Sequence, residues 1–375
     1  MDLFVADPDW HWWIILYFFC GGIAAGAYFV ATLIDLVGHE RERELSRVGY
    51  WIAFPLVLLC GLFLTVDLTR PERFWHMLFK SEIVHRGLEQ GWPSSAQSWR
   101  TMSHALIWKY WSPMSVGAWA LLIFGLCSFL SLLGSLWPDG KLAYFLRHSV
   151  VGKCFHLLGS AVGFFIAAYT GALLTATNQP LWSDTVWLAP LFLTSATTTG
   201  LATMMLLVRA RRTMPPVSWE SLQHAEVWAL VLELIVFGIF LVSLGGLLLP
   251  VLQTGHGKLL VIGTLVLGLL LPLALHVIGG LRPQPRTMLA AICSLAGGLV
   301  LRYALLTSPP EMLARGPQLR AQDAVLQNPR IGTPEPGLVS GFSPEDGRAR
   351  GGGPGADPGN KTANLEPRSK VFDAP

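Results

Sequence analysis

Apolar stretches long enough to cross a lipid bilayer recur along the first 306 residues of this chain. The hydrocarbon core of a bilayer is about 30 Å thick, and a helix needs about 20 residues to cross it. Hydrophobic residues make up 52% of the sequence, charged residues only 14%, and the mean hydropathy is +0.48. This composition excludes a soluble globular enzyme and places the chain in a membrane.

The apolar stretches are rich in Leu, Ala, Phe and Gly and do not alternate strictly, which favours helices over barrel strands. We therefore predict an all-α integral membrane protein with eight transmembrane helices in two four-helix groups. The predicted helices cover residues 12–38, 48–67, 112–136, 151–175, 187–208, 225–249, 258–281 and 287–306.

The two ends of the chain differ from this pattern. Residues 1–40 contain no Lys or Arg, so we expect the first apolar run to be a retained helix rather than a signal peptide. Residues 1–308 would form the transmembrane domain. Residues 309–375 are rich in Gly and Pro and predict a disordered tail, either a tether for a partner or an inert extension.

Basic residues gather in alternate short connections, which sets the predicted orientation. These residues are Arg41, Arg43, Arg47, Lys141, Arg147, Lys153, Arg209, Arg211, Arg212, Arg282 and Arg286. The connections that carry them should face the cytoplasm, so both termini should lie outside it. The long connection 68–111 is then external although it is basic, and long loops follow the charge rule weakly. Its Arg73 and Trp75 predict a docking surface for a partner, or alternatively an interfacial belt that contacts lipid headgroups.

An ionisable group inside a bilayer costs several kcal/mol unless it is paired or hydrated, so the few in these helices are functional candidates. Asp67 and Arg70 could pair across one helical turn, either to cap the helix or to shape a site. Glu233, with Glu226 two turns earlier, could carry protons or make an interhelical hydrogen bond. Arg302 could reach the headgroups or neutralise Asp67.

Tyr17 and Tyr169 are both predicted near the outer side, where they could share a pocket or belong to the aromatic belt. A phenol beside an apolar ring is suited to a quinone headgroup, because it can hydrogen-bond a carbonyl. His156, His224 and His276 lie near the cytoplasmic helix ends, where two facing imidazoles could hold a b-type haem. Interfacial histidines are the alternative interpretation.

Other cofactors and partners are not favoured by the sequence. A net charge of +3 does not indicate nucleic acid as a partner. The cysteines contain no C-x-x-C pair and fall in apolar stretches, so we expect core thiols and no iron–sulfur cluster in this chain. They are Cys20, Cys60, Cys127, Cys154 and Cys293.

These features together resemble the NrfD/PsrC family, the quinone-interacting membrane subunits of polysulfide-reductase-like complexes. The resemblance covers roughly residues 10–306. It rests on the Gly-rich segment 17–26, DLTRPERFW at 67–75, SPMSVGAW at 112–119, YTG at 169–171 leading to PLW at 180–182, and RY at 302–303.

The resemblance implies an eight-helix anchor without haem in the bacterial inner (plasma) membrane, with both termini periplasmic. It also implies a menaquinone or ubiquinone bound near the periplasmic surface. Tyr169 matches a family tyrosine beside the quinone, and Tyr17 falls where some members have a histidine. Ile14 occupies a position that is polar in some members. Asp67 and Arg70 would shape or polarise the pocket.

The resulting hypothesis is a quinone-interacting anchor of a respiratory oxidoreductase, non-catalytic itself or reactive only towards quinone. Electrons would pass between the quinone pool and a periplasmic ferredoxin-like iron–sulfur subunit. A catalytic redox subunit, a molybdopterin enzyme or a multihaem cytochrome, would complete the complex. Protons would exchange with the outer phase or along Glu233 and Glu226. The alternatives are a haem-bearing cytochrome b-type anchor, marked by a Soret band, and a secondary transporter, marked by solute uptake.

Overall fold

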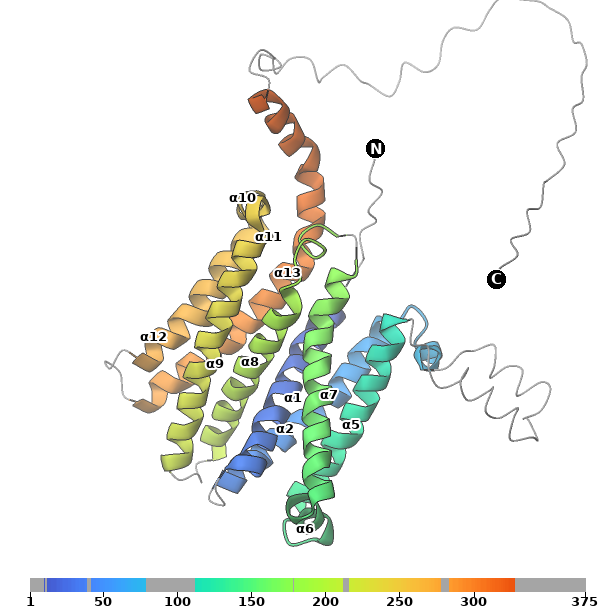
Figure 1. Cartoon of the computed structure of the whole chain (residues 1–375), viewed down its shortest axis with the longest axis vertical. Coiled ribbons are helices and arrows are strands. Elements are labelled where there is room, and N and C mark those ends of the chain that lie inside the picture. Colours follow the sequence, from blue (N-terminus) through green and yellow to red (C-terminus); the bar gives the residue numbers. More distant parts are fainter. Residues whose placement is uncertain are drawn as a thin grey trace, which may run out of the picture. The chain divides into compact units, whose positions relative to one another are not determined.

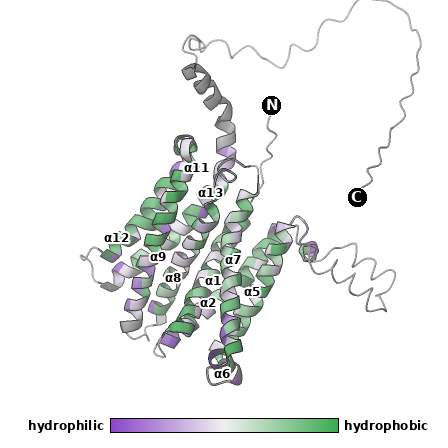
Figure 2. Cartoon of the chain, in the orientation of Figure 1, coloured by the Kyte–Doolittle hydropathy of each residue, from purple (hydrophilic) through white to green (hydrophobic). Residues whose placement is uncertain are grey.

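The computed structural model describes residue 10 and residues 12–38, 42–78, 112–177, 179–211, 216–277 and 283–327. All regular elements in these residues are helices (Figure 1), because only helices pair every backbone amide within one lipid-embedded segment. Eight spans are long and apolar enough to cross a membrane, and Figure 2 shows hydrophilic residues gathered near the helix ends. The predicted all-α membrane architecture with eight spans is therefore confirmed.

The first group of helices comprises α1, α2, α5 and α7, and two short helices accompany it. The bounds are α1 (Trp12–Val37), α2 (Arg43–Asp67), the 3-10 helix η2 (Pro71–Met77), α5 (Pro113–Leu136), α6 (Lys141–His148) and α7 (Val150–Thr175). Successive spans run in opposite directions, so the C-terminal ends of α1 and α5 lie on the same face as α6, here called the α6 face. The opposite face, here called the η2 face, carries η2 and the C-terminal ends of α2 and α7.

The second group comprises four further spans. Its elements are α8 (Leu188–Arg211), α9 (Pro216–Ser243), η3 (Gly245–Leu247), α10 (Leu248–Gln253), α11 (Gly255–Lys258), the π-helix η4 (Leu259–Leu270), α12 (Leu271–Val277) and α13 (Pro283–Gln327). Helices α11, η4 and α12 together form one span, Gly255–Val277. Gly268 of η4 and Gly297 of α13 face each other, since a Cβ at Gly268 would lie 2.9 Å from the Gly297 Cα.

Helices α1 and α8 join the two groups at a contact that only glycine permits. A Cβ at Gly26 would overlap the carbonyl of Ala196, and a Cβ at Gly200 would lie 2.5 Å from the Ala27 nitrogen. Small residues let membrane helices approach closely enough for dispersion forces to hold them together. The junction between the groups therefore depends on backbone-to-backbone packing.

Several helix bounds differ from those predicted. Helix α2 begins at Arg43 rather than at residue 48, because its first turns lie against the bundle and bury Leu45 and Val48. The basic connection 137–150 contains α6, an amphipathic helix that buries Ala143 and Leu146.

The largest difference is at the C-terminal end. Helix α13 runs to Gln327, past residue 308, where the predicted tail begins. Contacts divide the chain into two units, Met1–Leu319 and Arg320–Pro375, and the second contains the described residues 320–327. Residues 328–375 lie outside the described residues, so disorder there stays a prediction.

Candidate functional site

A large cavity of about 1230 Å³ opens within the first helix group, on the η2 side. Its wall is mostly apolar and comes from α1, α2, η2, α5 and α7. Ligand pockets usually measure about 300–1,000 Å³, so this one has room for a ring and part of a long tail. The lining includes Ile14, Tyr17, Phe18, Phe54, Val57, Leu58, Gly61, Asp67, Phe74, Gly117, Leu122, Leu126, Phe129, Tyr169 and Leu173.

One side of the cavity lies where α2 and α5 turn apolar side chains outward. Leu58, Leu122 and Leu126 line the cavity, and each is more than half exposed among the described residues. In a membrane such exposed leucines face acyl chains, so a lipid-soluble molecule could enter sideways between these helices.

The cavity brings Tyr17 and Tyr169 together, which is the first of the two arrangements that their predicted depth allowed. Tyr17 is buried, and among the described residues nothing hydrogen-bonds its hydroxyl. Tyr169 stacks on Phe165 and donates its hydroxyl proton to the carbonyl of Pro113 at the start of α5. The Tyr17 hydroxyl is thus a free donor in an apolar wall, whereas the Tyr169 hydroxyl must leave Pro113 before it can bond a ligand.

Glycines shape this cavity at two positions. A Cβ at Gly117 would lie 2.6 Å from the Tyr169 ring, so Gly117 provides the space in which that ring sits. A Cβ at Gly61 would meet nothing within 4 Å. Gly61 therefore borders open space in the cavity wall.

Asp67, the last residue of α2, lines the cavity, while Arg70 is not among the lining residues. No ion pair in the described part of the chain joins the two, so the predicted pairing is not formed. Arg70 instead lies between α2 and η2, and its side chain is exposed. Arg73 is exposed on η2 and Trp75 is half-buried, with its ring edge-on to His76.

Arg302 does not snorkel to the headgroups, and it contacts Phe18 and Ser195 rather than Asp67. It is only 1% exposed, and its guanidinium donates to the Phe18 carbonyl at 3.1 Å, to Ser195 Oγ at 3.1 Å and to the Gly298 carbonyl at 2.8 Å. Three acceptors and the rings of Phe19 and Phe192 satisfy this buried cation. Because Phe18 also lines the cavity, Arg302 connects the cavity to the second helix group.

Polar residues continue from Arg302 through the second group. Glu233 receives a hydrogen bond from Thr198 Oγ1 at 2.5 Å, and it also interacts with Ser195 and with the Arg302 charge. Two turns along α9, Glu226 lies 3.0 Å from His276 Nε2 and accepts from Ser294 Oγ at 3.3 Å. Both predicted carboxyls are thus part of buried polar clusters, and their serine, threonine and histidine partners were not identified from the sequence.

The three histidines considered for haem do not form a facing pair. His156 in the first group contacts Tyr50 and Ser131, His276 in the second group contacts Glu226, and His224 is exposed.

The turn between α7 and α8 closes the bundle next to the cavity. Trp182 is fully buried, stacks on Trp10 at 5.1 Å and donates its indole proton to the Leu305 carbonyl. Its neighbour Leu181 has a positive φ of 72°, and the backbone N–H of Leu181 donates a hydrogen bond to Asp184 Oδ2. Trp182 is therefore a packing residue of this turn.

Comparison with known proteins finds relatives that are named as subunits of reductases or as an NrfD homolog. The C chain of the polysulfide reductase of Wolinella succinogenes is 28% identical over 327 residues, which cover 79% of this protein and 93% of that one. An NrfD homolog of Haemophilus influenzae is 26% identical over 322 residues, covering 79% and 93%. The C subunit of the selenate reductase of Mesobacillus selenatarsenatis is 28% identical over 99 residues, which are 26% of this protein and 21% of that one. The model of the family described as "Polysulphide reductase, NrfD" matches residues 6–310, so the protein belongs to this family.

Proposed function

We propose that this protein is the quinone-reactive membrane subunit of a respiratory oxidoreductase complex. The observation that carries the proposal is the apolar cavity with a free tyrosine hydroxyl, Tyr17, in its wall. The cavity is larger than a soluble metabolite needs and is bordered by outward-facing leucines, as an entry from lipid requires. The relatives named as subunits of polysulfide and selenate reductases support a complex with catalytic partners.

A quinone bound here would supply a carrier of two electrons and two protons, either menaquinone or ubiquinone. Tyr17 would donate a hydrogen bond to one carbonyl oxygen of its ring. Tyr169 would donate to the other after releasing the Pro113 carbonyl. Asp67 lies at the η2 end of the cavity, where it would polarise the pocket and exchange protons with water, and the exposed Arg70 would contribute only its positive charge nearby.

The docking surface for an iron–sulfur subunit would be η2. Phe74 lines the cavity and is about half exposed, and Arg73 is exposed beside it. A partner that binds Arg73 and Trp75 would bring its nearest redox centre close to the ring. In this proposal the η2 face is periplasmic in the inner membrane, and both termini lie on that side.

The buried carboxyls of the second group would carry protons from the α6 face. Glu226 and Glu233 are separated by two turns, about 10 Å along α9. Thr198, Ser195 and Arg302 then lead from Glu233 to Phe18 in the cavity wall. Each group in this series can accept or donate a proton or hydrogen bond, so a few intervening waters would complete the path.

Removing the Tyr17 hydroxyl tests the proposed headgroup contact. Tyr17→Phe is expected to lower kcat/KM for a quinol analogue about tenfold to hundredfold, because one hydrogen bond at a buried site is worth about 1–3 kcal/mol. Tyr169→Phe should cost less, since its hydroxyl already has an acceptor in Pro113. The measurement is quinol-dependent electron transfer by the full chain with its co-purified subunits.

Tyr303→Phe is the matched control, because Tyr303 stacks on Trp12 away from the cavity. Equal rates for Tyr17→Phe and Tyr303→Phe would remove Tyr17 from the site. An unchanged rate for Tyr169→Phe would likewise remove Tyr169.

A further inference from the structure

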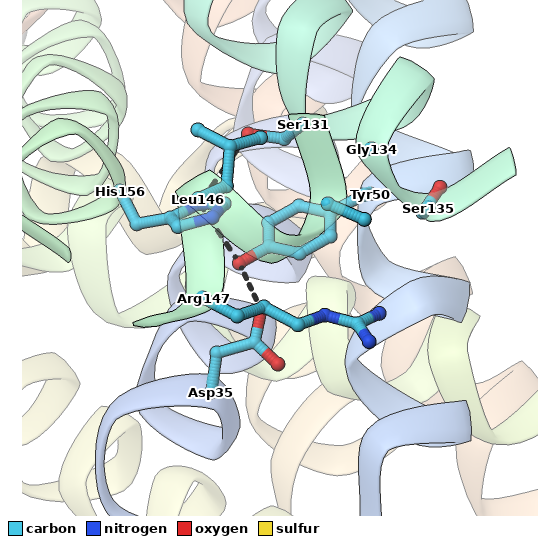
Figure 3. Close-up of a pocket in the computed structure, with 9 residues that line it drawn as sticks. Asp35, Tyr50, Ser131, Gly134, Ser135, Leu146, Arg147 and His156 are labelled. Atoms are coloured by element: carbon cyan, nitrogen blue, oxygen red, sulfur yellow. Dashed lines mark hydrogen bonds between the residues drawn. The ribbon is translucent and has the colours of Figure 1, made fainter. Parts of the chain in front are cut away.

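A further buried polar cluster lies at the α6 end of the first helix group (Figure 3). The Tyr50 hydroxyl donates to Asp35 Oδ2 at 2.8 Å and lies 3.1 Å from His156 Nδ1. Ser131 Oγ lies 3.3 Å from the same nitrogen and 2.9 Å from the Tyr28 hydroxyl. Apart from Asp35, which is half-buried, these side chains are buried, and each of the four helices α1, α2, α5 and α7 contributes at least one of them.

The directions of these bonds fix where a proton can add. Tyr50 has one hydroxyl proton and gives it to Asp35, so its oxygen can only accept from His156. His156 Nδ1 therefore carries a proton, and the free lone pair of the neutral ring is on Nε2. The imidazole can take up one more proton there, with the Asp35 carboxylate as its counter-charge through Tyr50.

Among the described residues, other titratable groups approach this cluster from α2, α5 and α6. Arg147 of α6 lines the same small cavity, and Arg47 of α2 donates to the Ser135 carbonyl and to Glu44. Cys127 of α5 lies near Tyr28. A positive charge at His156 would thus be favoured by Asp35 and opposed by Arg147.

The cluster is open to water on one side. A cavity of about 10 Å³, room for one water molecule, is lined by Asp35, Tyr50, Ser135, Arg147 and His156 (Figure 3). All of these residues offer polar groups to such a water. Asp35, near the end of α1, joins this position to the aqueous phase at the α6 face.

The other side of the cluster approaches the large cavity. Phe54 and Val57 follow Tyr50 by one and two turns on α2, and both line that cavity. Phe129, two residues before Ser131 on α5, lines it too. The Tyr28 ring packs edge-on against Phe124 at 5.4 Å, in the same core cluster as Val57. Val57 therefore belongs both to the core cluster that holds Tyr28 and to the wall of the large cavity.

We propose that Asp35, Tyr50, His156, Ser131 and Tyr28 form a proton-transfer site. It joins the α6 face to the end of the quinone cavity that is nearer to that face. A proton from water is taken up at the His156 and Asp35 end. His156 gives its Nδ1 proton to Ser131 Oγ, Ser131 gives its hydroxyl proton to Tyr28, and Tyr28 gives its own to the quinone ring as that ring is reduced. Asp35, through Tyr50, balances the positive charge on His156, and one proton leaves the α6 side for each proton that the ring receives. The last transfer requires Phe124 and Val57 to move aside. This inference rests on the proposed function, and the site is separate from Glu226 and Glu233.

The test uses the tagged full chain with its co-purified subunits in liposomes. A membrane-impermeant sulfonated viologen outside selects complexes whose redox partner faces outward, and a trapped pH dye reports protons at the α6 face inside. A short-tailed quinone analogue accepts the electrons that the reduced viologen supplies. His156→Gln and Tyr50→Phe are made in a Glu233→Gln chain, so that the carboxyls of the second group do not supply the same protons. In that chain each is expected to lower the internal pH change per electron at least fivefold. Asp35 is half-buried, so Asp35→Asn is the variant that should disturb folding least. It should lower the internal pH change per electron by a similar factor.

His148→Gln and Tyr144→Phe are matched controls, because both residues are exposed on α6 and should keep the parent value. If the parent turns over quinone but the three cluster variants keep its internal pH change, the proton site is wrong and the quinone site stands. The proton site is also wrong if the parent turns over quinone without an internal pH change. If the parent shows no quinone turnover, the proposed function fails, and this inference fails with it.

Discussion

Replacing Gly61 with phenylalanine is expected to lower quinone-dependent electron transfer at least hundredfold while leaving the protein folded. The new ring would project from α2 into the cavity, because a Cβ at Gly61 meets nothing within 4 Å. Phenylalanine also favours a helix more than glycine does, so the backbone is not weakened. A ligand ring that must share this space loses its binding position. The measurements are quinone binding to the purified chain and quinol-dependent turnover of the complex.

Gly238 offers a control for the same substitution. It lies on α9, is exposed, does not line the cavity, and a Cβ there also meets nothing within 4 Å. Gly238→Phe should keep parent turnover and binding. If Gly61→Phe is as active as Gly238→Phe, the cavity is not where the quinone reacts.

Replacing Gly26 with valine is expected to prevent the two helix groups from assembling. Its Cβ would overlap the Ala196 carbonyl, and neither backbone can retreat without moving a whole helix. Ordinary overpacking of a core costs about 1–3 kcal/mol, and a clash between backbones should cost more. Since a folded domain has only about 5–15 kcal/mol of stability, this cost removes a large share of it.

The measurement is the amount of monodisperse full chain recovered in detergent and its thermal unfolding temperature. Gly238→Val places the same side chain on a helix where no neighbour is displaced. Parent-like recovery and unfolding of Gly26→Val would show that the close α1 and α8 contact does not hold the groups together.

The spans could be predicted because length and hydropathy are local properties of the sequence. The short helices η2 and α6 could not, since both lie in connections where a few amphipathic residues give a weak signal. Position along a helix was also readable: Tyr17 and Tyr169 were expected at one depth, and both line the cavity.

Rotation about the helix axis could not be predicted. These spans are apolar nearly all round, so no polar face shows which side meets a neighbouring helix. Asp35, Tyr50 and His156 come from three helices, and only the packing brings them together. For the same reason the sequence left Arg302 either at the headgroups or beside Asp67, whereas Phe18 and Ser195 supply acceptors for it in the interior.

The central claim, that the cavity beside Tyr17 binds the quinone ring, can be tested directly by photolabelling. The purified full chain would be irradiated with an azidoquinone, digested, and the labelled peptides located by mass spectrometry. We expect saturable labelling of residues 54–68 and 113–126, the α2 and α5 walls of the cavity, with loss of label when unlabelled quinone is added. The account would be contradicted by label that unlabelled quinone displaces but that lies only in the second helix group. Label that unlabelled quinone does not displace would contradict it too.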